Sequence, residues 1–297
     1  MTQIVLVHHA ARRGMGRPAN SLGALCACVK AQARIIEVDV QALADGDFAL
    51  LHDALLERAT DGRGPVGAAV AADVARLRLL SQGEQSEEPV ALLSQVVALV
   101  QRVDSLVELQ LDLKAHPTAL LPDGKLRLLA QLVEPLGQRV RVSSVADWAL
   151  RRLHALAPRV PLGFDPLLYL DVRDDEKDMP PYRAGAYGYR DDHPLAAVRW
   201  GPARDYLAMR AEALWHQAPM ATVWYIRGST LARALDDGFD WIADLHAQGV
   251  QVDAWTLDAA SPGDVELARR LVQAGVDRIT TDDPPALARV LGVSVAY

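Results

Sequence analysis

Short runs of branched apolar residues alternate with longer amphipathic stretches along almost all of the 297 residues. The runs typical of strands lie at residues 4–8, 35–41, 106–113, 140–143, 160–164, 221–226, 250–257 and 278–281. The main stretches typical of helices lie at residues 21–33, 120–136, 147–156, 203–215, 229–248 and 262–274, with Gly238 a possible break in the fifth of them. Alternation of this kind predicts a parallel sheet covered by helices. The length favours closure into a TIM (β/α)8 barrel, an α/β fold, with a single domain over residues 1–297.

Two regions depart from this simple alternation. Residues 165–200 follow the fifth predicted strand and contain prolines, tyrosines and charges without a clear period. They exceed the length of an ordinary barrel connection, so we expect an insertion or lid there. Residues 71–80 and 91–102 have helical patterns and are separated by the polar stretch 82–88. Two further helices are therefore predicted between the second and third barrel strands.

The net charge, the first residues and the cysteines indicate which partners and which location to expect. A formal net charge of −7 argues against a general nucleic-acid binder, whose footprint is usually basic. The chain begins with the strand-like run 4–7 and shows neither an export signal nor an apolar run as long as a membrane span. Cys26 and Cys28 lie two residues apart on a predicted helix, so they do not face each other for a disulfide. We expect a cytoplasmic protein with a small-molecule partner and no integral membrane association.

Two carboxylates stand two residues apart inside the apolar run Ile35-Ile36-Glu37-Val38-Asp39-Val40. Because strand side chains alternate between faces, Glu37 and Asp39 share one face. Two buried acids this close are unfavourable unless a cation or hydrogen-bond donors compensate them. The Asp45-Gly46 turn leads into a second apolar run that delivers His52. The pattern indicates a metal-assisted acid/base site at strand ends.

Other predicted strands supply further candidates. Polar and apolar residues alternate in residues 109–114, so Gln110, Asp112 and Lys114 share a face. His8 stands at the end of the first strand. The carboxyl ends of all strands meet at one mouth of a parallel barrel, where enzymes of this fold carry their active sites. We therefore expect these side chains to converge with Glu37 and Asp39.

The chain resembles the glycerophosphodiester phosphodiesterase family, which shares its barrel with the phosphatidylinositol-specific phospholipases C. The matching motifs are spread over essentially the whole length, and their order and spacing match together. They are His8, Pro18-Ala19-Asn20-Ser21, Glu37-Val38-Asp39-Val40, Asp45-Gly46, His52-Asp53, residues 56–66, Asp112-Leu113-Lys114, Trp255-Thr256-Leu257-Asp258 and residues 275–282.

The resemblance implies a divalent cation held by Glu37, Asp39 and Asp112. Asp112 stands where the family usually carries glutamate, so its carboxylate reaches one methylene less far. A set of carboxylate ligands suits a hard cation, Mg²⁺ or Ca²⁺. Lys114, on the same face as Asp112, would contact the substrate phosphate as a point charge.

The resemblance also implies that His8 and His52 are the catalytic imidazole pair. One group must remove a proton from the attacking hydroxyl and another must protonate the leaving alkoxide, and the sequence does not assign the two tasks. An adjacent hydroxyl of the substrate would attack first, giving a cyclic phosphate that water then opens. His9 and Trp255 are expected to contact substrate at the mouth. The alternatives are that His9 packs behind the barrel and that Trp255 is a core aromatic.

Several positions of the family pattern are altered. Where the family typically has His-Arg-Gly, this chain has His8-His9-Ala10, and the glutamate that usually precedes Asn20 is Ala19. The missing arginine would be a phosphate ligand. Arg12 and Arg13 are candidates for this contact, although neither reproduces the bidentate fork without local rearrangement.

Three functions remain open on the sequence. The first is metal-dependent hydrolysis of glycerophosphodiesters to an alcohol and glycerol 3-phosphate, lost without His8 or His52. The second is a phospholipase- or lysophospholipase-D-like lipid phosphodiesterase, which would need an apolar approach surface such as residues 166–189. The third is a barrel that binds phosphodiesters but has lost turnover. The sequence determines neither the alcohol head group, nor the choice between Mg²⁺ and Ca²⁺, nor the oligomeric state.

Overall fold

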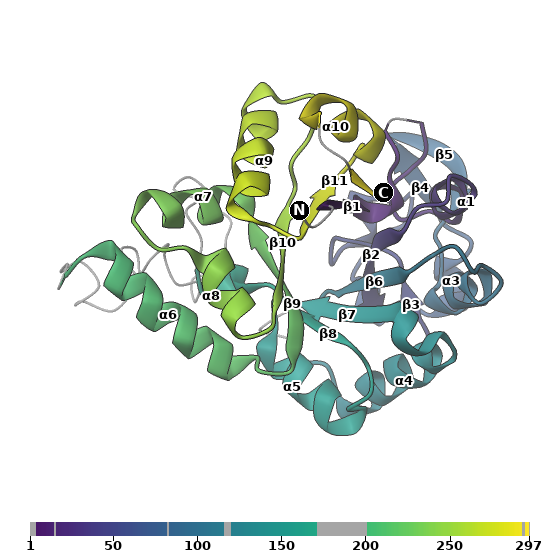
Figure 1. The fold of residues 1–297 in the computed structure, drawn as a ribbon. Coiled ribbons are helices and arrows are strands. Elements are labelled where there is room, and N and C mark those ends of the chain that lie inside the picture. The colour runs from purple at the N-terminus through teal and green to yellow at the C-terminus, as the bar shows by residue number, and fades with distance from the viewer. Residues whose placement is uncertain are drawn as a thin grey trace.

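The computed structural model describes residues 4–14, 16–81, 83–115, 120–170 and 201–292, together with the backbone of 295–296. Within these ranges the centre is a closed barrel of parallel strands (Figure 1). The barrel strands, in order around the ring, are β1 (Ile4–His8), β2 (Ile35–Ala42), β6 (Glu108–Leu113), β7 (Val140–Ser144), β8 (Leu162–Phe164), β9 (Ala221–Arg227), β10 (Gln251–Trp255) and β11 (Arg278–Thr281). Pairing of β1 with β2, with His8 opposite Ile36, closes the ring. The predicted TIM barrel is confirmed.

Helices surround the barrel and bury its outer face (Figure 1). They are α1 (Leu22–Lys30), α3 (Leu93–Val100), α4 (Asp123–Val133), α5 (Asp147–Leu156), α6 (Ala203–Gln217), α7 (Gly228–Asp236), α8 (Trp241–Ala247), α9 (Pro262–Ala274) and α10 (Pro284–Leu291). Local sequence explains the ends of these helices. The Ser21 hydroxyl caps α1 by accepting from the Ala24 N–H at 3.0 Å, and Gly275 ends α9 in the left-handed conformation, with φ at 96°.

The region between β2 and β6 differs from the sequence expectation. β3 (Phe48–Ala49) pairs antiparallel with β2. Of the predicted helix over 71–80, only Ala71–Val74 is helical, as α2, and β4 (Arg78–Ser81) and β5 (Glu84–Pro89) then form an antiparallel hairpin. The predicted helix over 71–80 was therefore wrong beyond Val74, and residues 84–88 of the polar stretch belong to β5. The apolar residues Val74 and Leu79, whose spacing suggested one helix, lie in α2 and β4, and both pack into the same small core cluster. The second predicted helix, over 91–102, corresponds to α3.

Two predicted helical stretches are each divided in the structure. The stretch 229–248 forms α7 and α8, which are separated at Gly238, whose φ is 83°. The stretch 120–136 ends as an α-helix at Val133, where the 3-10 helix η4 (Glu134–Arg139) with Pro135 begins. Of the predicted insertion at 165–200, residues 165–170 contain the 3-10 helix η5 (Pro166–Leu168), and residues 171–200 lie outside the described residues.

Polar side chains fill much of the barrel interior. At its amino-terminal end, Glu108 of β6 lies 2.6 Å from Arg278 of β11 and 3.0 Å from Arg141 of β7. One layer higher, the Thr280 hydroxyl donates to Asp253 at 2.9 Å. Because strand side chains alternate, these residues identify the inward-facing set of each strand. The layer nearest the carboxyl ends then includes Asp39 on β2, Asp112 on β6, Arg227 on β9 and Trp255 on β10.

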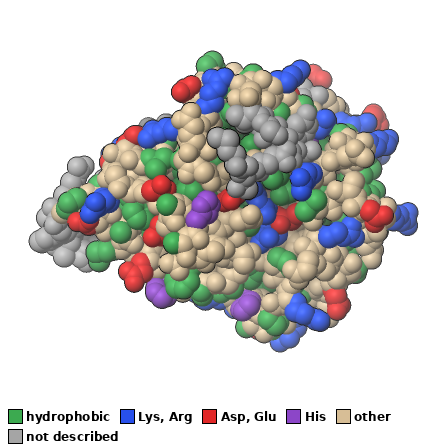
Figure 2. Space-filling model, viewed as in Figure 1, with side chains coloured by type: hydrophobic (Ala, Val, Ile, Leu, Met, Phe, Trp, Pro, Cys, Tyr) green, Lys and Arg blue, Asp and Glu red, His purple; other side chains and the backbone are tan. Residues whose placement is uncertain are grey.

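The surface carries charges of both signs. On the face seen in Figure 2, Lys and Arg side chains are interspersed with Asp and Glu. Within the described part of the chain, no helix combines the length and apolar character needed to cross a membrane.

Candidate active site

Three carboxylates converge at the carboxyl ends of two neighbouring strands. Glu37 and Asp39 come from β2, and Asp112 of β6 stands opposite Asp39 in the strand register. One oxygen from each carboxylate lies within 4.8 Å of the others. Glu37 is 3% exposed and Asp39 is 2% exposed. The shorter aspartate at position 112 therefore still reaches the acidic cluster.

One lysine partly balances these acids. Lys114 Nζ lies 2.8 Å from Asp39 Oδ1 and 2.6 Å from Asp112 Oδ2. Burial raises the pKa of Glu37, and the charge of Asp39 raises it further. Burial acts on Asp39 in the same sense, but Lys114 outweighs it and lowers the pKa of Asp39. One ammonium among three carboxyl groups leaves the cluster short of positive charge, which a further cation would supply.

The loop between β1 and α1 provides donors to the buried acids. Asn20 donates its amide Nδ2–H to Asp39 Oδ2 at 2.7 Å, and its Oδ1 accepts from the Asp39 N–H at 3.0 Å. The Ala10 N–H donates to Glu37 Oε2 at 2.6 Å. These contacts fix the orientation of both β2 carboxylates. The sequence indicated Asn20 only as a motif residue, and the residue that caps α1 is Ser21.

The two adjacent histidines lie in different layers. His8 is fully buried and faces α1, where its Nδ1 donates to the Arg12 carbonyl at 2.8 Å and Cys28 Sγ lies 3.5 Å away. Burial lowers the pKa of His8 to about 4. Left-handed backbone at Ala10 and Ala11, with φ of 47° and 56°, follows the end of β1. Side chains of β1 alternate, so His8 shares the outer face with Leu6, and His9 turns to the opposite, inner face. His9 consequently lines the pocket and His8 does not.

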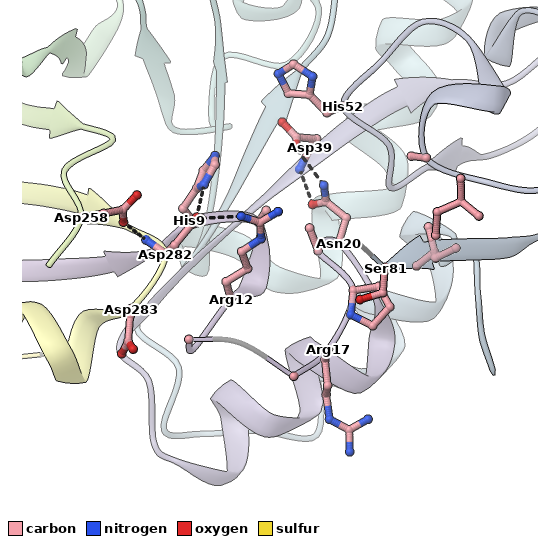
Figure 3. A pocket seen from close by; sticks show the side chains of 18 of the residues that line it. His9, Arg12, Arg17, Asn20, Asp39, His52, Ser81, Asp258, Asp282 and Asp283 are labelled. Carbon is pink, nitrogen blue, oxygen red and sulfur yellow. Dashed lines mark hydrogen bonds and ion pairs between the residues drawn. The ribbon is translucent and has the colours of Figure 1, made fainter. Parts of the chain in front are cut away.

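His9 is held by the end of the last barrel strand (Figure 3). Its Nδ1 lies 2.7 Å from Asp282 Oδ1, and the Arg12 guanidinium bonds to the other oxygen of Asp282. Burial alone lowers the pKa of His9, but the Asp282 hydrogen bond and the charge of Glu37 outweigh it and raise the pKa to about 9. The Asp282 N–H in turn donates to Asp258 Oδ1 at 2.9 Å. The imidazole therefore has a fixed orientation.

His52 stands on the opposite side of the same pocket from Asp282 (Figure 3). Its side chain is 63% exposed, and Nδ1 lies 3.6 Å from Asp53 Oδ1. Its charge also lowers the pKa of Asp39, although burial and Lys114 act on that carboxyl more strongly. His9, Asp39 and His52 share a hollow of about 1110 Å³. The hollow extends past Arg12 and Asn20 to the β4–β5 hairpin.

Trp255, the remaining predicted substrate contact, ends β10 and is half-buried. The Arg227 guanidinium carbon lies 4.9 Å from the centre of the Trp255 ring. Glu37, Asp112, Lys114 and Trp255 do not themselves line the hollow that contains His9 and His52.

Several residues of the site had no assigned role in the sequence expectation. They are Asn20, Arg227 and Asp282, with Arg12 expected only as one of two alternatives. Asp282 directly follows the last strand, so the position of strand ends could have predicted its place at the mouth. The orientation of His9 had no such signal, because residues 4–7 are apolar at every position and do not mark the inner face of β1.

Three known proteins to which this chain is similar are all described as phosphodiesterases. The chain is 23% identical over 299 residues to a glycerophosphodiester phosphodiesterase of Caldanaerobacter subterraneus subsp. tengcongensis, with 98% of each chain covered. Two solved structures share the fold. A Silicibacter pomeroyi protein assigned to the glycerophosphoryl diester phosphodiesterases has a TM-score of 0.71 at 20% identity, with 99% of this chain and 96% of that chain covered. An Oleispira antarctica phosphodiesterase in complex with the product sn-glycerol-3-phosphate has a TM-score of 0.65 at 21% identity, with 98% of each chain covered.

The model of the glycerophosphoryl diester phosphodiesterase family matches residues 13–286. The match begins after both His8 and His9, so it does not decide between them. It covers most of the chain, including the three clustered carboxylates and His52. The chain therefore belongs to the glycerophosphoryl diester phosphodiesterase family, a family of phosphoric diester hydrolases.

Proposed function

We propose that this protein hydrolyses glycerophosphodiesters to an alcohol and glycerol 3-phosphate with the help of a divalent cation. The observation that carries the proposal is the convergence of Glu37, Asp39 and Asp112, with oxygens within 4.8 Å of one another, close to the pocket that holds His9 and His52. The bound sn-glycerol-3-phosphate of the Oleispira antarctica relative supports this choice of product.

The acidic cluster fits a hard cation. Its donors are carboxylate oxygens, which Mg²⁺ and Ca²⁺ prefer. Burial and mutual repulsion raise the pKa of Glu37, so a cation that favours the ionised carboxylate would relieve an unfavourable arrangement. Glu37, Asp39 and Asp112 would hold the cation. When bound, it would supply positive charge that polarises the phosphate and stabilises the transition state.

His9 takes the catalytic place that the sequence expectation gave to His8. The Asp282 hydrogen bond occupies Nδ1 of His9 and keeps the imidazole protonated near neutral pH, which leaves Nε2 to donate a proton. We assign His9 as the general acid that protonates the leaving alkoxide. His52, exposed at the rim, would accept the proton of the attacking hydroxyl. His8 is retained as a packing residue beneath the loop.

The reaction would proceed in two steps. The substrate hydroxyl next to the phosphoester loses its proton to His52 and attacks phosphorus. The bond between phosphorus and the oxygen of the leaving alcohol breaks as His9 protonates that oxygen. Water then opens the resulting cyclic phosphate to glycerol 3-phosphate, and the two imidazoles exchange roles. Lys114 and Arg12 would contact the phosphate oxygens, and Trp255 would contact the substrate at the mouth.

A diester panel tests the proposal. Purified protein is incubated with several glycerophosphodiesters, with lysophospholipid and with sphingomyelin, in Mg²⁺ or Ca²⁺ and again in EDTA. We expect metal-dependent release of glycerol 3-phosphate from the water-soluble diesters, lost in His9→Ala and His52→Ala. Preferential cleavage of the lipids would favour the lipid phosphodiesterase, and binding without product from any member would favour the inactive barrel. A cytoplasmic location and the absence of nucleic-acid binding stay predictions.

A further inference from the structure

The hollow that holds the two imidazoles has room for more than a phosphate and a glycerol. Its volume of about 1110 Å³ exceeds the usual range of pockets for small molecules. From His9 it continues past the ends of β10 and β11 to α10, where it is lined by Asp258, Ala259, Ala260, Asp282 and Ala286. The small alanine side chains leave space beside His9 for a further part of a substrate.

The proposed roles of the two imidazoles decide which part of the substrate lies at this end. His9 would protonate the leaving alkoxide, so the alcohol departs on the side of His9. His52, which would activate the attacking hydroxyl of the glycerol, stands on the opposite side of the pocket from Asp282 (Figure 3). The alcohol head group therefore extends from His9 toward Asp258 and the start of α10.

The Asp258 carboxylate has a fixed orientation at this end (Figure 3). Its Oδ1 accepts from the Thr281 hydroxyl at 3.0 Å and from the Asp282 N–H at 2.9 Å. The Asp258 N–H donates in turn to Asp264 Oδ2 at 3.2 Å, which ties the loop to α9. Within the described part of the chain, no donor bonds to the other carboxylate oxygen of Asp258, Oδ2. One oxygen of a half-buried, oriented carboxylate thus stays open to a ligand in the hollow.

The neighbouring carboxylate of Asp282 is already engaged. Its Oδ1 lies 2.7 Å from Nδ1 of His9, and its Oδ2 accepts from the Arg12 guanidinium. Both oxygens are used by cationic groups of the chain itself, which ties Asp282 to the catalytic imidazole. A contact with the head group consequently falls to Asp258.

Helix α10 adds two charges of opposite sign to this end of the hollow. Asp283 caps the helix by accepting from the Ala286 N–H at 3.1 Å. Arg289 follows Ala286 by about one turn and also lines the hollow. Because these two charges oppose each other, the charge of Asp258 determines the sign of the group that this end prefers.

An ammonium group is the natural complement of such a carboxylate. Hydrogen bonds between ionised partners are stronger than those between neutral ones, and a neutral hydroxyl at the same place would leave the charge of Asp258 unbalanced. Asp258 and His9 both bond to Asp282, so the ammonium and the leaving oxygen would be held close together. An alcohol with a short carbon chain between its oxygen and its nitrogen fits these two contacts.

We propose that Asp258 binds an ammonium group on the alcohol, and so makes the protein prefer glycerophosphodiesters with a cationic head group over those with a neutral one. The inference rests on the proposed function for the reaction and for the side on which the alcohol leaves. It assigns to Asp258 Oδ2 a direct contact with the substrate, while Oδ1 holds the loop in place.

Two diesters that differ in the charge of the alcohol test the assignment. Glycerophosphoethanolamine carries an ammonium group, and glycerophosphoglycerol carries a neutral diol. In Mg²⁺ or Ca²⁺, Asp258→Asn should lower kcat/KM for the ethanolamine diester about 5- to 50-fold, the scale for loss of a hydrogen-bonded charge that is partly exposed. The value for the glycerol diester should stay close to that of the wild type, because asparagine keeps an oxygen for Thr281 and Asp282.

Asp240→Asn is the matched control. It removes the same charge from the outer helix α8, where Asp240 accepts from the Ala243 N–H at 3.0 Å and asparagine can replace it as a cap. It should leave the ratio of the two kcat/KM values unchanged. Equal losses on both diesters in Asp258→Asn, with a shifted alkaline limb of the pH profile, would show that Asp258 only positions Asp282 and His9, and would overturn the contact.

Calorimetric titration with the two intact diesters separates this inference from the proposed function. If the wild type hydrolyses neither diester, the proposed function fails, and the preference is measured as a ratio of dissociation constants instead. Asp258→Asn should then reduce the preference for the ethanolamine diester by the same factor. A ratio that Asp258→Asn leaves unchanged, in turnover or in binding, would overturn the assignment of Asp258.

Discussion

His9 Nδ1 lies 2.7 Å from Asp282 Oδ1, across the seam where the first and last strands of the barrel pair. The contact joins a residue just after β1 to one just after β11, so barrel closure itself places the imidazole. Because the carboxylate favours the charged ring, it also controls the pH range in which His9 can donate a proton.

Replacement of Asp282 by asparagine should lower the pKa of His9 from about 9, because a neutral amide no longer favours the charged imidazole against the effect of burial. A general acid is active below its pKa, so the falling alkaline limb of kcat/KM should move to lower pH. In the wild type, the raised pKa of His9 contributes stability that is complete below about pH 6.5 and is lost as pH rises through about 9, and Asp282→Asn should lose this contribution.

The matched control for that change is Asp277→Asn. Asp277 Oδ2 lies 2.8 Å from Nε2 of His246 on the outer helix α8, so it forms the same type of pair away from the pocket. It should leave the pH profile of kcat/KM unchanged. An unmoved alkaline limb in Asp282→Asn would contradict the role of Asp282.

Glu37→Gln should make the metal-free protein more stable and abolish its response to metal. The change removes one of two adjacent buried acids but keeps an oxygen for the Ala10 N–H, so in EDTA the free energy of unfolding should rise by about 1–3 kcal/mol. Mg²⁺ or Ca²⁺ should stabilise the wild type in proportion to its occupancy and leave Glu37→Gln unaffected. Urea unfolding with and without metal measures both effects. Glu88→Gln, whose partner is the exposed Arg17, should respond to metal like the wild type.

The left-handed turn after His9 can be tested with glycine. At Ala11, with φ at 56°, glycine relieves strain but loses a buried methyl group and gains unfolded-state entropy. These effects nearly cancel, so Ala11→Gly should unfold within about 0.5 kcal/mol of the wild type. Ala24→Gly, in the regular helix α1, has no strain to relieve and should destabilise by about 1–2 kcal/mol. Equal losses in urea unfolding at both positions would argue against strain at Ala11.

Asp253 should make the barrel interior sensitive to pH. Burial raises the pKa of its carboxyl from 3.8 to about 6, so the folded state holds the proton more tightly than the unfolded state. The resulting stability is present below about pH 4 and is lost as pH rises through about 6. The free energy of unfolding of Asp253→Asn should therefore exceed that of the wild type by on the order of 1–3 kcal/mol above pH 6, with the difference growing between pH 4 and 6. A difference that is constant over this range would contradict the shifted carboxyl.

The barrel could be predicted because the sequence patterns of its strands and helices are local and recur along the chain. Most buried strands carry branched apolar residues and are followed by a helical pattern, as strand 140–143 is by the helix over 147–156. The position of the acids followed from the same periodicity, since Glu37, Asp39 and Asp112 share inward faces of neighbouring strands. The hairpin β4–β5 was missed because its strands are largely polar and short, and their partner cluster is assembled from distant segments.

The choice between His8 and His9 could not be made from sequence periodicity. Alternation puts His8 and His9 on opposite faces, but residues 4–7 are apolar at every position and so do not mark which face is inner. The turn after His9 is formed by two alanines rather than by glycine. Tertiary contacts stabilise this turn: Ala10 bonds to Glu37 and Asn20, and the Arg12 carbonyl bonds to His8. The roles of Lys114 and Trp255 stay predictions, as does the expected insertion beyond residue 170.

The most direct test follows a single glycerophosphodiester by ³¹P NMR in the wild type, His9→Asn and His8→Asn. With Mg²⁺ or Ca²⁺ the wild type should convert the diester to a cyclic phosphate and then to glycerol 3-phosphate, and EDTA should stop the conversion. His9→Asn should react about 10²- to 10⁴-fold more slowly, as for loss of a general acid. His8→Asn should retain the wild-type rate wherever it remains folded. An unchanged rate in EDTA, or wild-type turnover by His9→Asn, would contradict the account.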